Sequence, residues 1–369
     1  MTLTRDQLRA LPKVSLHDHL DGALRPQTII ELAEEIGWQL PDAAADGDAA
    51  LRDWFYEAST SGSLELYLQT FTHVVAVLQT PESLTRIARE YVHDLAADGV
   101  VYGETRWAPE QHTQGEMTMR DAVQAVAAGL VQGMAECAQQ GHPIVVRQLL
   151  CSMRHNEPST EVAELALEFK DRGVAGFDIA GAEDGFPADR FASAFATIRA
   201  GGGHSTAHAG EADGPESIRQ AVIECGAERV GHGVRIMEDI CFDADSPKLG
   251  KIATYLRDHH IPLEVCPTSN VQTGICDSIA DHPFPILADL GFLVTVSCDN
   301  RLQSRTTLTE EFALLCEAFG YGIEAVERFT VDAARAAFWD EDSRERLVTG
   351  TIRPAFAAAR GVEPVPPPR

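Results

Sequence analysis

The stretch LHDHLDG, residues 16–22, carries two histidines, His17 and His19, and places Asp21 two residues further on. Residues two apart on a strand point to the same face of a sheet, so both imidazoles are predicted to share one face. Taken alone, such a pair is equally typical of two hydrogen-bonded core histidines. The positions of the other histidines and acidic residues along the chain decide between these interpretations.

The predicted strand over residues 14–20 is the first of eight short segments that alternate with helical stretches. Strands that alternate with helices favour a closed parallel sheet, and barrels of this kind routinely exceed 250 residues as one domain. The sequence therefore predicts an α/β fold, a single (β/α)8 TIM barrel over residues 1–360. The other seven predicted strands span residues 100–109, 144–153, 174–181, 204–211, 229–234, 262–270 and 293–300.

Two regions depart from a plain barrel. The first crossover, residues 22–99, is much longer than one helix, and a long helical insertion of this kind is typical of a lid over an active site. Within it, Ser63 is predicted to cap a helix whose apolar stripe lies in the core (Leu64, Tyr67, Leu68, Phe71, Val74, Val75 and Leu78). After the eighth strand we expect further helices over residues 307–357 and a disordered Pro-rich tail over residues 361–369.

Composition excludes several classes of partner. The 369 residues are 44% hydrophobic and carry a net charge of −26, which argues against binding to nucleic acid or to anionic membrane. The eight cysteines are scattered singly, as in a reduced cytoplasmic protein, and no apolar run has the length of a signal peptide or a membrane span. We therefore expect a cytoplasmic protein with a small-molecule substrate, and the sequence leaves the oligomeric state open.

Three further motifs complete the candidate site. His208 begins HAGE, His232 lies in GHG, and Asp299 lies in SCDN, at the ends of the fifth, sixth and eighth predicted strands. Catalytic residues of such barrels come from the carboxyl ends of the strands, so these side chains should meet those of His17 and His19. Three imidazoles and one carboxylate suit Zn²⁺ with water in an open position, whereas an iron oxygenase of the two-histidine type needs only three of the four.

The chemistry predicted for this group is hydrolysis. Zinc lowers the pKa of bound water from about 15.7 to 7 and so supplies a nucleophile at neutral pH. Glu211 lies three residues after His208 and can transfer a proton to a substrate, with a helix-capping carboxylate as its alternative role. His232 is predicted to orient or to deprotonate the water, with a structural histidine as the alternative.

Taken together, the motifs LHDHLDG, FDIAGAE, HAGE, GHGVR, CPTSN and SCDN resemble those of the adenosine deaminase family over residues 11–357. The resemblance implies a barrel with one zinc ion per chain that hydrolyses the 6-amino group of adenosine or 2′-deoxyadenosine, a purine salvage reaction on the C–N bond of a cyclic amidine. It also implies a role for each matching residue. The zinc ligands are His17, His19, His208 and Asp299.

The same resemblance assigns the residues that touch the substrate. Glu211 becomes the proton donor to purine N1, and His232 with Asp299 positions the attacking water. Asp21 takes a ribose hydroxyl beside His19, and the backbone of Gly181 meets N3. One departure is Asn300, where many family members have a second Asp; an amide donates a hydrogen bond to N7 at any pH.

Three alternatives remain at the level of the sequence. The nearest is a deaminase of another 6-aminopurine, either adenine or an adenosine with a modified 5′ group; Asp21 disfavours AMP because a carboxylate repels phosphate. A catalytically silent nucleoside-binding barrel is the second, although every expected catalytic position is filled. A binuclear hydrolase is the third, but the strand over residues 174–181 lacks the lysine that bridges two metals.

Overall fold

The computed structural model describes residues 3–60, 62, 64–242 and 247–361. Two four-stranded parallel sheets form its centre. The first runs in the order β1 (Lys13–His19), β2 (Val100–Trp107), β3 (Val145–Met153) and β4 (Val174–Ala180). The second runs in the order β10 (Val294–Val296), β9 (Leu263–Val265), β6 (Arg229–His232) and β5 (Thr206–Ala209).

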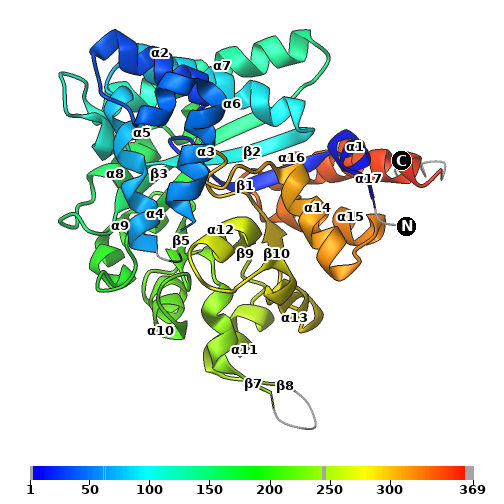
Figure 1. The fold of residues 1–369 in the computed structure, drawn as a ribbon. Helices are drawn as coiled ribbons and strands as arrows, with labels where there is room; N and C mark the ends of the chain where they lie inside the picture. The colour runs from blue at the N-terminus through cyan, green and yellow to red at the C-terminus, as the bar shows by residue number, and fades with distance from the viewer. Residues whose placement is uncertain (1–2, 61, 63, 243–246, 362–369) are drawn as a thin grey trace.

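Two isolated parallel bridges join the sheets into one barrel. Asp18 pairs with Asp299, which links β1 to the segment after β10, and Phe177 pairs with Ser205, which links β4 to the residue before β5. The helices surround these strands (Figure 1). The predicted (β/α)8 fold class is confirmed by this closed order of eight parallel strands.

The strands of the second sheet are shorter than predicted. Where a strand over residues 262–270 was expected, β9 ends at Val265 and the helix α12 (Pro267–Gln272) follows, because Pro267 is suited to the first turn of a helix and cannot donate to a ladder. The antiparallel hairpin β7 (Ile240–Phe242) and β8 (Pro247–Leu249) was not predicted. Because β5 ends at Ala209 and β10 ends at Val296, HAGE and SCDN extend beyond their strands into loops at one end of the barrel.

The long first crossover contains α2 (Pro26–Ile36), η1 (Asp42–Asp46), α3 (Asp48–Ser59), α4 (Leu64–Gln69), α5 (Phe71–Val77) and α6 (Pro81–Ala97). The helix predicted to follow Ser63 is therefore two helices, α4 and α5, separated at Thr70, whose hydroxyl donates to the carbonyl of Tyr67. A side chain that bonds to the backbone in this way competes with the helical ladder. The predicted cap, Ser63, lies outside the described residues.

The remaining helices follow the strands or close the chain. α1 (Arg5–Ala10) precedes β1 and packs against α14 (Leu308–Phe319). The others are η2 (Pro109–His112), α7 (Met119–Gln139), α8 (Glu161–Glu168), η3 (Lys170–Arg172), η4 (Ala188–Phe191), α9 (Ala192–Ala200), α10 (Pro215–Arg219), η5 (Gln220–Glu224), η6 (Val234–Asp239), α11 (Lys251–Asp258), η7 (Ile279–Asp281), α13 (Phe284–Asp289), α14 (Leu308–Phe319), α15 (Ile323–Ala336), α16 (Glu341–Leu347), η8 (Val348–Ile352) and α17 (Arg353–Ala359). From residue 362 on, the predicted tail lies outside the described residues.

Within the part of the chain that the structure describes, no helix combines the length and the apolar composition needed to cross a membrane.

Helices α6 and α7 pack closely because α7 has two interior glycines where they meet. A Cβ at Gly129 would lie 2.8 Å from the Cβ of Ala88 and closer still to the carbonyl oxygen of Thr85. A Cβ at Gly133 would lie 2.8 Å from that of Val92. Glycine in a helix interior costs about 1 kcal/mol relative to alanine, so these positions favour close approach over helix propensity.

We predict that Gly129→Ala lowers the free energy of unfolding by about 1–3 kcal/mol, because the added methyl group overpacks this contact. The matched control is Gly350→Ala in η8, where a Cβ would meet no atom within 4 Å. That change should raise stability by about 0.4–1 kcal/mol through the unfolded chain. Urea titrations of both variants measure the difference, and stabilisation by both would contradict the close contact.

Candidate active site and metal centre

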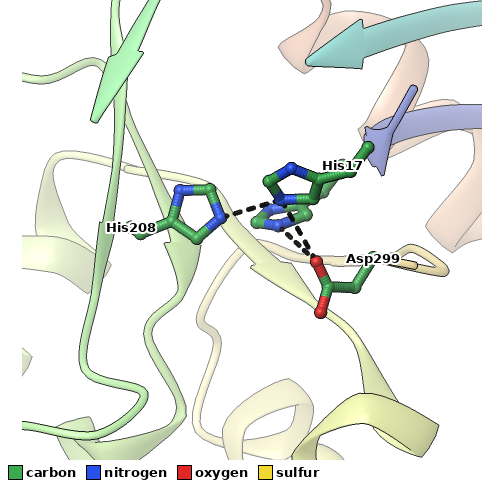
Figure 2. A group of neighbouring side chains, drawn as sticks. His17, His208 and Asp299 are labelled. Carbon is green, nitrogen blue, oxygen red and sulfur yellow. Dashed lines mark hydrogen bonds and ion pairs between the residues drawn. The ribbon is translucent and has the colours of Figure 1, made fainter. Parts of the chain in front are cut away.

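Four predicted ligands come together at the end of the barrel where β1, β5 and β10 end. Ligand atoms of His17, His19, His208 and Asp299 all lie within 4.8 Å of one another. The Nε2 atoms of His19 and His208 are 3.2 Å apart, and Asp299 Oδ1 lies 3.3 Å from His19 Nε2 and 3.4 Å from His17 Nε2. Figure 2 shows His17, His208 and Asp299 turned toward one another.

Two carboxylates behind the site determine which ring nitrogen is free. His17 Nδ1 lies 2.9 Å from Glu264 Oε2, and His208 Nδ1 lies 3.1 Å from Asp178 Oδ2. A carboxylate beside a neutral imidazole favours the tautomer whose N–H faces it, so each Nδ1 keeps its proton and each Nε2 presents a lone pair to the site. His17 Nε2 is buried and has no hydrogen-bond partner among the described residues, which fits a ligand atom for a cation.

Arg106 holds both of these carboxylates. Its Nη1 lies 2.7 Å from Asp178 Oδ2 and its Nη2 lies 2.7 Å from Glu264 Oε2, with all three side chains fully buried. Burial alone would raise the pKa of Glu264, but the guanidinium of Arg106 and that of Arg229 hold it well below its usual range. Glu264 is therefore anionic at neutral pH, and it keeps the His17 proton on Nδ1.

His208 is neutral as well as oriented. Burial lowers the pKa of His208 to about 4, although the nearby carboxylate of Asp178 acts in the opposite direction. Neutral imidazole is the form that ligates a metal. The ligand set of three imidazole rings and one carboxylate fits a zinc ion with room for one more ligand.

A second group of potential ligands, His17, His232 and Cys266, also lies within 4.8 Å. It fits a metal less well. Burial raises the pKa of the Cys266 thiol well above its usual value, whereas zinc binds the thiolate.

His232 and Asp299 share a strained backbone conformation. Their φ angles are 60° and 62°, in the left-handed region that residues other than glycine rarely adopt. Such strain persists where surrounding contacts determine the conformation, and it clusters at functional sites. Asp299 is fixed further by the hydroxyl of Ser269, which donates to Oδ2 at 2.7 Å and leaves Oδ1 for the ligand cluster.

The loop that carries Glu211 is held by one carboxylate, that of Glu183. Its two oxygens accept five hydrogen bonds, from the N–H groups of Gly210, Glu211, Ala212 and Asp213 and from the hydroxyl of Ser217, at distances of 2.6–3.0 Å. Successive backbone N–H groups form a concavity for an anion, and here the anion is a side chain of the protein. Glu211 is thereby placed beside the ligand cluster.

Glu211 is prepared to carry a proton. Burial raises its pKa well above the usual value, and the negative charges of Asp299 and Glu183 act in the same direction. Its Oε2 lies 3.6 Å from Nε2 of His232. A buried neutral carboxyl next to candidate metal ligands is suited to general acid catalysis.

A pocket opens beside these residues, and every residue predicted to bind substrate lines it. His19, Asp21, Gly181 and Asn300 border it together with Glu211. Gly181 has a φ of 93°, which an L side chain rarely adopts, so the backbone is bare at this wall. Asn300 packs against Gly22, where a Cβ would overlap its Oδ1.

One wall of the pocket corrects the predicted core stripe of the first crossover. Val74 and Leu78 lie in the core as expected. Tyr67 is also buried as expected, although it borders the pocket. Leu64, Leu68 and Phe71 are only half-buried and line the pocket, so the prediction was wrong for these three. An apolar stripe of helical period does not distinguish a core from the apolar wall of a ligand site.

Sequence reasoning missed the residues that orient the site: Arg106, Asp178, Glu183, Glu264 and Ser269. A signal for three of them was present, because Arg106, Asp178 and Glu264 interrupt apolar strands. A charged side chain inside a buried strand must be paired, and its presence there indicates a partner. Cys298 lies next to Asp299, and burial raises the pKa of its thiol well above the usual value, which favours a small buried apolar group over an oxidation-sensitive thiol.

Comparisons with known proteins extend over nearly the whole chain. A sequence profile described as adenosine deaminase matches residues 12–353. An adenosine deaminase of Mycolicibacterium vanbaalenii is 51% identical over 361 residues, 97% of this chain and 99% of that protein. Among solved structures, a Burkholderia ambifaria amidohydrolase with bound zinc has a TM-score of 0.82 at 26% identity, covering 98% of this chain and 95% of that one. An Arthrobacter aurescens adenine deaminase has a TM-score of 0.78 at 25% identity, covering 95% of this chain and 100% of that one.

We predict that Asp178→Asn weakens zinc binding about 10–100-fold, because His208 loses the partner that orients its ring. Competition with a chromophoric chelator measures this affinity. The matched control is Glu228→Gln, which disrupts a pair of the same chemistry on the surface, 2.9 Å from His204 Nδ1. Equal zinc affinities in the two variants would show that Asp178 does not support zinc binding.

Proposed function

The chain belongs to the adenosine deaminase family, and we propose that it hydrolyses the 6-amino group of adenosine and 2′-deoxyadenosine in a zinc-dependent reaction. The products are inosine or 2′-deoxyinosine and ammonia. The observation that carries the proposal is the buried carboxyl of Glu211 next to four converging ligand atoms. His17, His19, His208 and Asp299 would hold one zinc ion per chain, which would supply a water-derived nucleophile at neutral pH.

The protein residues carry out the remaining chemistry. Addition of an oxygen at C6 moves electrons toward N1 of the purine, so N1 must gain a proton as the bond forms. Glu211 donates that proton because its raised pKa keeps it protonated. Asp299 and His232, both fixed in left-handed backbone conformations, position the attacking oxygen.

The pocket favours a nucleoside over a nucleotide. Among the described residues that line it there is neither lysine nor arginine, and a 5′-phosphate would need such a cation. Asp21 Oδ1 is buried without a hydrogen-bond partner and would accept a ribose hydroxyl beside His19. Gly181 would offer its backbone to N3 and Asn300 its amide to N7.

The second candidate is a deaminase of adenine or of an adenosine with a modified 5′ group. The similarity to an adenine deaminase structure at 25% identity favours it, and the unpartnered carboxyl of Asp21 disfavours free adenine. A silent nucleoside-binding barrel is disfavoured because Glu211 and all four ligands are present.

We place the activity in purine salvage in the cytoplasm, where buried thiols such as that of Cys298 stay reduced.

The direct test incubates metal-analysed protein with adenosine, adenine, AMP and a 5′-modified adenosine, and follows the ultraviolet absorbance of the base together with ammonia release. Adenosine should react fastest, with about one zinc per chain. If only adenine or only the modified nucleoside reacts, the protein is the second candidate, a deaminase of that compound. Silence on all four substrates with zinc bound would support the binding-protein alternative.

We predict that Glu211→Gln lowers kcat by about 100–10,000-fold and leaves the zinc content unchanged, because it removes the acid and no ligand. In the parent enzyme, kcat should fall as the pH rises through the raised pKa of Glu211, since the carboxylate has no proton to give. The variant should lack this alkaline limb. Glu216→Gln, on the exposed side of the following helix, serves as control, and near-normal turnover of Glu211→Gln would exclude the assigned role.

We predict that Asp21→Ala lowers kcat/KM for adenosine about 10–100-fold and changes kcat/KM for adenine less, because adenine has no ribose to contact Asp21. The ratio of the two kcat/KM values in parent and variant isolates the sugar contact. Equal losses for nucleoside and base would show that Asp21 acts on the site as a whole.

A further inference from the structure

A chain of three buried polar side chains leads from the backbone of α13 to His232. The N–H of Phe284 donates to His282 Nδ1 at 3.0 Å, His282 Nε2 lies 3.2 Å from Asn270 Oδ1, and Asn270 Nδ2 lies 3.0 Å from His232 Nδ1. All three side chains are 2% exposed or less. Of these three side chains, only that of His232 has a role in the function proposed above.

The N–H of Phe284 fixes the direction of these hydrogen bonds. A backbone N–H is only a donor, so His282 Nδ1 must accept and the proton of the neutral ring lies on Nε2. That N–H donates to Asn270 Oδ1, which turns the amide NH₂ group toward His232. His232 Nδ1 therefore accepts, and the proton of its neutral ring lies on Nε2.

The reverse arrangement is disfavoured by the same contacts. If Asn270 turned its oxygen to His232, its NH₂ group would face the Nε2–H of His282, and two buried donors would oppose each other. Burial lowers the pKa of His282 to about 4, so this ring is neutral and has one donor nitrogen and one acceptor nitrogen. With the side chains closed from solvent, water cannot satisfy either group in the reversed arrangement.

We propose that Asn270 and His282 are positioning residues that fix His232 as the tautomer with its proton on Nε2, facing the reacting atoms. This inference rests on the proposed function and decides between the two roles that the sequence left open for His232. The neutral ring donates a hydrogen bond to the oxygen that adds to C6 and does not remove its proton. His232 Nε2 is 3.6 Å from Glu211 Oε2, so the donor lies beside the acid.

The first test needs no substrate. In the zinc-loaded protein labelled with ¹⁵N-histidine, one-bond ¹H–¹⁵N couplings and ¹⁵N chemical shifts identify which nitrogen of each ring carries hydrogen. The His232 signals are identified by their loss in His232→Gln. The proposal predicts a bare Nδ1 and a protonated Nε2, and a proton on Nδ1 in the parent protein would overturn it. Failure of the deaminase assay alone would not affect this result.

The second test uses matched changes at His282. His282→Gln retains an amide N–H for Asn270, whereas His282→Met removes the donor at similar volume. We expect His282→Met to populate both His232 tautomers and to lower kcat about 10-fold, with KM within about twofold and zinc content unchanged. His282→Gln should restore the single tautomer and most of kcat.

His259→Met, at an exposed histidine on the outside of the barrel, controls for the loss of an imidazole. Unchanged tautomers and kcat in His282→Met would overturn the role of His282. Equal losses in the Gln and Met variants would reduce His282 to a packing residue and contradict the proposal as well.

Discussion

The guanidinium of Arg106 lies between the two carboxylates that orient the metal-binding imidazoles, and the arrangement of the site depends on this contact. A charge buried in a barrel interior is unfavourable unless it is paired, and loss of one partner leaves the other uncompensated at a cost of about 3–5 kcal/mol. Asp178, Glu264 and Arg106 therefore fix one another. Because each carboxylate also binds Nδ1 of a histidine, the same contacts that stabilise the ions determine which nitrogen faces the metal.

A similar principle operates at the mouth of the barrel. The carboxylate of Glu183 gathers the N–H groups of the loop after β5, and its charge helps to keep the carboxyl of Glu211 protonated. Ser269 holds one oxygen of Asp299, and Asn270 holds one nitrogen of His232. Asp299 and His232 thus each have one atom anchored by the protein and one atom left for chemistry.

The sequence predicts the parts of this structure that depend on local pattern. Period-two placement of His17 and His19, and the position of HAGE and SCDN at the ends of predicted strands, suffice to bring the four ligands together. The partners Asp178 and Glu264 are distant in sequence from the histidines they bind, and nothing local specifies those pairings. The apolar stripe from Leu64 to Phe71 was assigned to the core because helical periodicity predicts an apolar face. It does not show whether that face packs against the protein or against a substrate.

A crystal structure of the zinc-loaded protein with anomalous data at the zinc edge tests this metal centre most directly. We expect one zinc per chain, bound by Nε2 of His17, His19 and His208 and by Oδ1 of Asp299, with Nδ1 of His17 and of His208 still on its carboxylate. A zinc ion on His17, His232 and Cys266, or a ligand histidine turned away from Glu264 or Asp178, would contradict it.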